Sequence, residues 1–252
     1  MAQDKIKVAA VGDLHCTKAS AGQLRSLFAQ AAEMADMLLL CGDLTDYGLA
    51  EEAEVLAQEL AVVKKMPVVA VLGNHDYESG TPEEVNRVLT SAGVRMLDGD
   101  AVEIEGIGIA GVKGFAGGYG RHALGPWGEG MIKAFVNEAI QEALKLESAL
   151  AKLRTPQRIA LLHYSPILGT VQGEPPEIYA YLGTSRLEDP LVHYPVDVIF
   201  HGHAHRGSPE GKTVNNIPVY NVARPLLQRS NPNLPAFRIV EFARNKVEFA
   251  RN

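Results

Sequence analysis

The chain has 252 residues, a hydrophobic fraction of 46%, a charged fraction of 21% and a formal net charge of −6. This length and composition are typical of a soluble globular protein with a substantial core, and we expect residues 1–252 to form a single domain. The absence of a lysine and arginine cluster argues against a nucleic-acid partner, and no apolar stretch approaches the roughly 20 residues of a membrane span.

The start of the sequence does not have the pattern of a secretory signal peptide. Lys5 and Lys7 interrupt the first apolar run, and Asp13 follows it closely. The sequence has only two cysteines, Cys16 and Cys41, which is typical of a cytoplasmic protein with reduced thiols. We therefore expect a cytoplasmic localisation. The sequence leaves the oligomeric state open, a homo-oligomer included.

Apolar periodicity predicts that strands and helices alternate through the first part of the chain. Ser20, with Gln23 three residues later, is expected to cap the first helix. Thr81 and Pro82, followed by two glutamates, form a strong start for the third helix. The predicted elements are a strand at 6–11, a helix after Ser20, a strand at 37–40, a helix at 50–64, a strand at 68–72 and a helix from 82 that stops at Gly93.

In the second part of the chain, the sequence pattern predicts further strands and one long helix. Gly106 separates two short strands, as in a tight hairpin. The predicted elements are strands at 94–97, 101–105 and 107–112, a glycine-rich irregular segment at 114–130, a helix at 131–153, a strand at 159–162, a loop with a short helix at 165–195, and strands at 196–200, 213–215, 218–221, 237–242 and 246–249.

Five of the predicted strands end on polar clusters rich in histidine, aspartate or asparagine. In α/β folds, ligands bind just beyond the carboxyl ends of the strands, so the five clusters predict one shared site. The residues concerned are Asp13 and His15, Asp43, Asn74 with His75 and Asp76, His163, and His201 with His203 and His205.

These residue types are suitable ligands for Mn, Fe or Zn, and asparagine can contribute its carbonyl oxygen. Residues two apart in an extended segment point the same way, so Asp13 and His15 can reach one ion. The same spacing joins His203 to both His201 and His205, which leaves the role of His201 open. Several imidazoles and carboxylates converging without a metal would be costly to desolvate.

The ordered set D-x-H, G-D, G-N-H-D, H and G-H-x-H, spread from residue 13 to 205, resembles the calcineurin-like metallophosphoesterase superfamily. The resemblance implies an α/β fold in four layers, α-β-β-α, with two mixed sheets flanked by helices. It also implies a phosphoester hydrolase in which hydroxide bridging two metal ions attacks phosphorus in line with the leaving oxygen.

The same resemblance implies a role for each residue. Asp13, His15 and His205 would hold one metal ion, Asn74, His163 and His203 would hold the other, and Asp43 would bridge both. His75 would protonate the leaving oxygen, with Asp76 orienting it. His201 precedes the glycine of G-H-x-H, and the family pattern places it beside the site.

Within the superfamily, the sequence matches compact bacterial phosphohydrolases, including those similar to class III cyclic-nucleotide phosphodiesterases. Tyr47 stands where serine/threonine phosphatases carry a phosphate-clamping arginine, and Asp46 where purple acid phosphatases carry a tyrosine ligand. We expect a small phosphodiester substrate. A phosphomonoesterase, or a non-catalytic scaffold of the same fold, is the alternative.

Substrate choice is expected to reside in the loops. The glycine-rich segment 114–130 could bind phosphate through an arginine and stack a base on a tryptophan, or could be a surface loop over a buried tryptophan. Arg206 and Arg224 follow the last cluster, and either could touch substrate or be solvated. The loop residues considered are Tyr119, Arg121, His122 and Trp127.

Overall fold

A mixed five-stranded sheet carries the first three polar clusters. The structure is a computed structural model that describes residues 5–63 and 65–244. The strand order is β11-β1-β2-β3-β4, with β1 to β4 parallel and β11 antiparallel to β1. The strands are β1 (Lys5–Val11), β2 (Met37–Cys41), β3 (Val68–Val71), β4 (Arg95–Met96) and β11 (Arg238–Ala243).

A mixed six-stranded sheet carries the other two clusters. Its order is β5-β6-β7-β8-β10-β9, in which β6, β7, β8 and β10 are parallel and the edge strands β5 and β9 are antiparallel to their neighbours. The strands are β5 (Asp100–Ile104), β6 (Ile107–Val112), β7 (Gln157–Leu162), β8 (Val198–His201), β9 (Glu210–Lys212) and β10 (Pro218–Asn221).

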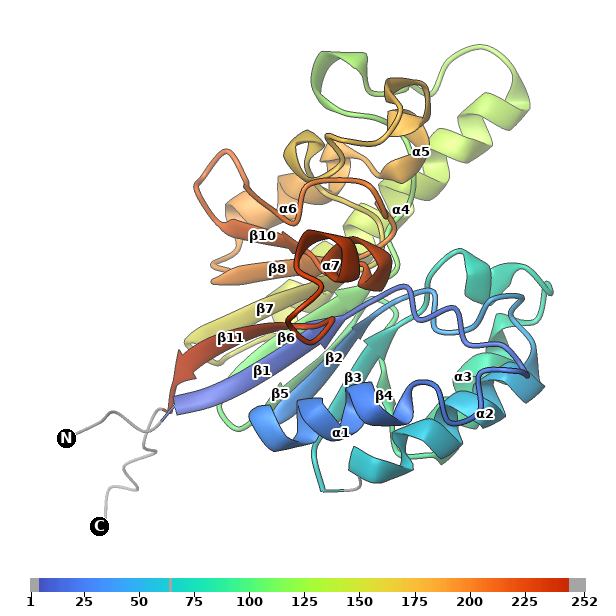
Figure 1. The fold of residues 1–252 in the computed structure, drawn as a ribbon. Coiled ribbons are helices and arrows are strands. Elements are labelled where there is room, and N and C mark those ends of the chain that lie inside the picture. The colour runs from blue at the N-terminus through green and yellow to red at the C-terminus, as the bar shows by residue number, and fades with distance from the viewer. Residues whose placement is uncertain (1–4, 64, 245–252) are drawn as a thin grey trace, which may run out of the picture.

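The two sheets pack face to face, and helices cover their outer faces (Figure 1). In β2, Leu38 and Leu40 pack against the helices, whereas Met37 and Leu39 pack against the second sheet. This alternation follows from the period of two in a strand, and because both faces are buried the strand is apolar throughout. The predicted four-layer α/β sandwich is confirmed.

The helices differ in what they cover. α1 (Arg25–Met34), α2 (Ala50–Leu60) and α3 (Pro82–Ser91) pack on the first sheet, and α4 (Gly130–Lys152) and α6 (Glu188–His193) pack on the second. The short helices α5 (Tyr179–Leu182) and α7 (Arg224–Ser230) lie near the site described below. None of the helices in the described ranges is apolar over a length that would cross a bilayer.

The start of α1 differs from the prediction. The helix begins at Arg25, and the Ser20 hydroxyl accepts from the Thr17 backbone N–H instead of capping it. The buried Glu59 carboxylate on α2 accepts from the backbone N–H groups of Gly22, Leu24 and Arg25 at 2.8–2.9 Å. A side chain 34 or more residues away in sequence therefore caps this helix. The capping residue predicted from the local sequence, Ser20, does not.

One further prediction fails in the last part of the chain, and one helix was not predicted. The expected strand at 213–215 is a turn that follows β9, and α7 lies in a segment for which the sequence predicted no element. The strand predicted at 246–249 lies outside the described residues. The other predicted strands and helices occur within a few residues of their expected positions.

Candidate metal centre

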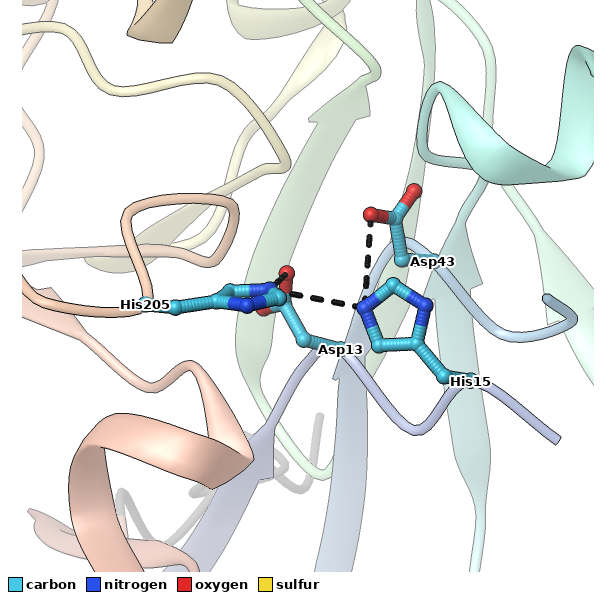
Figure 2. Close-up of side chains that lie close together, drawn as sticks. All are labelled: Asp13, His15, Asp43 and His205. Carbon is cyan, nitrogen blue, oxygen red and sulfur yellow. Dashed lines mark hydrogen bonds and ion pairs between the residues drawn. The ribbon is translucent and has the colours of Figure 1, made fainter. Parts of the chain in front are cut away.

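The predicted ligands come together at the carboxyl ends of β1, β2, β3, β7 and β8. The predicted ligands form two groups, and within each the possible ligand atoms lie within 4.8 Å of one another; a third such group joins His15 to Asp46 and His75. Asp13, His15, Asp43 and His205 form the first group (Figure 2), and Asp43, His163 and His203 form the second. Asp43 belongs to both groups, so the two would hold neighbouring cations.

In the first group, imidazole nitrogens and carboxylate oxygens face one another. His205 Nε2 lies 2.9 Å from Asp13 Oδ1 and 3.4 Å from His15 Nε2, which in turn lies 3.8 Å from Asp43 Oδ2 (Figure 2). Two imidazole nitrogens and two carboxylates facing one another are a donor set suited to a divalent cation. The residues therefore fit a metal ion.

The second group adds an amide oxygen. His163 Nε2 lies 3.3 Å from Asp43 Oδ1 and 2.9 Å from Asn74 Oδ1, and its Nδ1 donates to the Cys41 carbonyl. His203 Nε2 donates to the Tyr181 carbonyl at 3.1 Å, which leaves Nδ1 as its possible ligand atom. Both hydrogen bonds fix the tautomer, as is usual for metal-binding histidines.

The backbone at the candidate ligands is strained. Asp13, His15, Asp43 and His203 adopt left-handed conformations, with φ of +56°, +46°, +47° and +70°. They are four of the six non-glycine residues with positive φ in the described ranges. Such conformations cost of order 1–3 kcal/mol each and persist where the surroundings impose them, frequently at functional sites.

Two motif glycines make room for a ligand from another motif. A Cβ on Gly73 would overlap the Asp43 backbone nitrogen and carboxylate, and a Cβ on Gly202 would overlap the Asp13 carboxylate. The glycines of G-N-H-D and G-H-x-H are therefore explained by close approach across the site.

His75 lies at the rim of the first group with its side chain 41% exposed. Its Nδ1 donates to the Asp46 carbonyl at 2.8 Å and lies 3.6 Å from the Asp46 carboxylate. Asp46 Oδ1 also accepts from His15 Nδ1 at 3.0 Å. This role of Asp46 was not predicted from the sequence, where the available signal was its place three residues after Asp43 in the turn that follows β2.

The expected pairing of Asp76 with the His75 side chain is wrong. The Asp76 carboxylate is buried and accepts from the N–H groups of Leu44, Thr45 and Gly73 and from the Thr45 hydroxyl, at 2.6–3.2 Å. His75 and Asp76 are consecutive residues of a 3₁₀ turn, in which neighbouring side chains point about 120° apart. Asp76 joins the turn after β2 to the turn after β3, and so supports the ligands structurally.

A family model described as "Calcineurin-like phosphoesterase" matches residues 6–207, most of the chain and every candidate ligand. The chain belongs to the calcineurin-like phosphoesterase family. It is accordingly a hydrolase with a cluster of metal-binding residues. No curated protein sequence gives a significant match.

Solved structures show the same fold at low sequence identity. The phosphopantetheinyl hydrolase PptH from Mycobacterium tuberculosis aligns with a TM-score of 0.65 at 14% identity, over 93% of this chain and 95% of that one. TT1561 of Thermus thermophilus gives 0.55 at 14% identity, over 96% and 100%. The purple acid phosphatase PPD1 from yellow lupin gives 0.52 at 16%, over 81% of this chain and 38% of that one.

Burial sets the protonation of this phosphoesterase's candidate ligands. Burial, followed by the charge of Asp13, raises the pKa of Asp43 to about 7. Burial would also raise the pKa of Asp13, but the hydrogen bond with His205 and the nearby histidines lower it. Burial lowers the pKa of His203 to about 3, so its imidazole is neutral and able to bind a metal at neutral pH.

Metal uptake by the metal-free protein is therefore expected to release a proton at and below neutral pH. Above pH 7 the Asp43 carboxylate is already ionised, whereas below it a proton must leave before a cation binds. If one proton is displaced, the apparent affinity for the metal should fall about tenfold for each pH unit below 7. Calorimetric titrations in two buffers of different ionisation enthalpy measure the proton release, and an affinity independent of pH would contradict this expectation.

Replacing Asp76 with alanine is expected to lower the free energy of unfolding by about 3–5 kcal/mol, because three buried N–H groups and one hydroxyl lose their acceptor. Urea denaturation measures this loss. Asp100→Ala is the control, since the Asp100 side chain is 71% exposed and its ion pair with Lys152 is worth little. Equal stability of the two variants would show that Asp76 does not hold the turns together.

Two other residues named in the sequence analysis, His201 and Trp127, lie outside the two groups of candidate ligands. His201 is buried, its Nδ1 donates to the Gly202 carbonyl, and its Nε2 lies 2.8 Å from the Thr170 hydroxyl. Trp127 is 78% exposed, so the alternative of a buried tryptophan under the loop 114–130 is wrong. This loop packs against the segment around α5, where Gly117 donates to the Ala180 carbonyl.

Proposed function

We propose that this phosphoesterase works with two metal ions and that its substrate is a small phosphodiester. The observation that carries the dinuclear assignment is the placement of Asp43. Its Oδ2 faces His15 of the first group, and its Oδ1 faces His163 of the second. A carboxylate with one oxygen toward each group is suited to bridge two cations.

Asp13, His15 and His205 would hold one ion, and Asn74, His163 and His203 the other, with Asp43 shared. When bound, two such ions polarise the phosphoryl oxygens and lower the pKa of water toward neutrality. Mn, Fe and Zn all suit this set of imidazole, carboxylate and amide ligands.

His75 would donate a proton to the leaving oxygen. Because its Nδ1 donates to the Asp46 carbonyl, Nε2 is the nitrogen that can transfer a proton. The Asp46 carboxylate lies 3.6 Å from the same Nδ1, so it faces the ring nitrogen that does not transfer the proton. Asp46 would also orient His15, since it accepts from the Nδ1 of that ligand. One carboxylate thus supports both a candidate ligand and the candidate acid.

A neutral side chain next to Asp46 in the sequence favours a diester over a monoester. Tyr47 follows Asp46 and is 57% exposed, in the place where the resembling serine/threonine phosphatases carry an arginine. A monoester dianion gains more from an added cation than a diester with one negative charge does. The alternative enzymatic function for this fold is a phosphomonoesterase.

The direct test strips the protein of metal, restores Mn, Fe or Zn in turn, and measures hydrolysis of bis-p-nitrophenyl phosphate and p-nitrophenyl phosphate. We expect no activity without metal and a higher kcat/KM for the diester. Full activity in the stripped protein would overturn the metal mechanism. A preference for the monoester with every metal would overturn the diesterase assignment.

A further inference from the structure

A groove lies between α1 and the segment that follows α7. None of the candidate metal ligands lines it, and its residue Arg224 reaches the turn between Asp13 and His15. The groove has a volume of about 420 Å³, within the range of small-molecule sites. Its lining includes hydrogen-bonding side chains, namely those of Gln23, Ser26, Gln30, Arg224 and Gln228. Leu27 and the proline, leucine and alanine side chains of residues 232–236 form the apolar part of the lining.

Arg224 is the one charged residue among the described residues that line this groove. Its Nη1 lies 3.5 Å from the Leu14 carbonyl, at the long limit of a hydrogen bond, and no ion pair of Arg224 occurs within residues 5–63 and 65–244. Burial lowers the pKa of Arg224, with no carboxylate nearby to oppose it. A half-buried guanidinium therefore has most of its five N–H donors free to bind a ligand.

The lining favours one class of ligand. A guanidinium fork with neighbouring amide and hydroxyl donors matches the three terminal oxygens of a phosphate group, which need more donors than a carboxylate does. The net charge of the whole chain is −6, so a groove lined by a cation and neutral donors differs in charge from the rest of the molecule. The apolar side chains of Leu27 and residues 232–236 would pack against the organic part of a small ester.

We propose that this groove is a second anion-binding site, in which Arg224 holds the phosphate group of a small phosphate ester outside the metal centre. The site does not require a metal ion, so its occupancy can be measured independently of the hydrolysis. The phosphate could belong to a separate small molecule or to a distal group of the substrate, and the experiments below distinguish these sources.

The test is calorimetric titration of inorganic phosphate into the 252-residue chain, both loaded with metal and stripped of it. We expect one phosphate to bind to the stripped protein, and Arg224→Gln to weaken that binding about tenfold or more. Arg224→Lys should weaken it less, because it keeps the charge and loses the fork. Arg25→Gln is the matched control, since Arg25 begins α1 and does not line the groove.

A second variant keeps the test valid if Arg224→Gln folds poorly. Gln228 is exposed, and Gln228→Glu places a negative charge in the groove without disturbing the core. It too should weaken phosphate binding while the circular dichroism spectrum and Tm stay unchanged. The proposal is overturned if the stripped protein binds no phosphate at millimolar concentration, or if folded Arg224→Gln and Gln228→Glu both bind phosphate as the wild type does.

A comparison of KM values for two substrates distinguishes the sources of the phosphate. This part of the test rests on the proposed function. If the groove holds a distal phosphate of the substrate, Gln228→Glu raises KM for a diester that carries a second phosphate and leaves KM for bis-p-nitrophenyl phosphate unchanged. If it holds a separate molecule, both KM values stay unchanged while phosphate binding to the stripped protein is still lost. Failure of hydrolysis itself would refute the proposed function and leave the binding result intact.

Discussion

Asp43→Asn is expected to abolish the retention of two metal ions and to lower kcat by about a thousandfold or more. Metal ions supply several kcal/mol of transition-state stabilisation, and each 1.4 kcal/mol is tenfold in rate. The neutral amide keeps one oxygen but cannot offer a charged oxygen to each half of the site. Metal content per chain, measured by mass spectrometry after gel filtration, and kcat on bis-p-nitrophenyl phosphate together test this.

The control is Asp98→Asn, which makes the same chemical change at a side chain that is 55% exposed and paired with Lys145. This control should keep both its metal content and its activity. An Asp43→Asn protein that still carries two ions per chain would remove the bridging role from Asp43. The pH dependence of metal uptake should also lose the proton released near pH 7 in this variant, which links the two measurements.

His75→Ala is expected to slow hydrolysis in a way that depends on the leaving group. Proton donation by a positioned side chain contributes about 10²- to 10⁴-fold. Phenol and alcohol leaving groups need this proton more than p-nitrophenol does, because p-nitrophenolate is a stable anion. We therefore expect a loss of about a hundredfold or more on a phenyl or alkyl ester and a smaller loss on the p-nitrophenyl ester.

Two comparisons make the His75 result specific. His193→Ala removes an exposed imidazole from the end of α6 and should leave both rates unchanged. Asp46→Asn should show the leaving-group dependence in weaker form, because it removes the carboxylate beside the His75 ring and keeps the backbone carbonyl that accepts from Nδ1. A His75→Ala protein with unchanged rates on the alkyl ester would exclude His75 as the acid.

The position of the site was predictable because it depends on the strands. Asp43 and His163 each follow an apolar run, and the carboxyl ends of such strands meet at one edge of an α/β sandwich. The orientation of side chains within the turns was not predictable in the same way. Whether Asp46 or Asp76 contacts His75 depends on a 3₁₀ turn and on left-handed backbone at Asp43, and neither has a sequence period.

The start of α1 and the presence of α7 were missed for different reasons. The capping of α1 by Glu59 joins residues that are far apart in sequence, so the local Ser20 signal gave the wrong start. α7 is seven residues long and begins with Arg224 and Pro225, which is too short for a clear helical period. The groove beside Arg224 follows from the placement of this short helix and could not be expected from the sequence.

The Asp76 carboxylate ties two ligand-bearing turns together with hydrogen bonds that involve no cation. The coordination sphere is consequently preorganised: its spacing is fixed by the folded chain before loading, and different cations must adapt to the same arrangement of donors. Exchange of one metal for another should then change the reactivity of the centre while the surrounding scaffold stays the same.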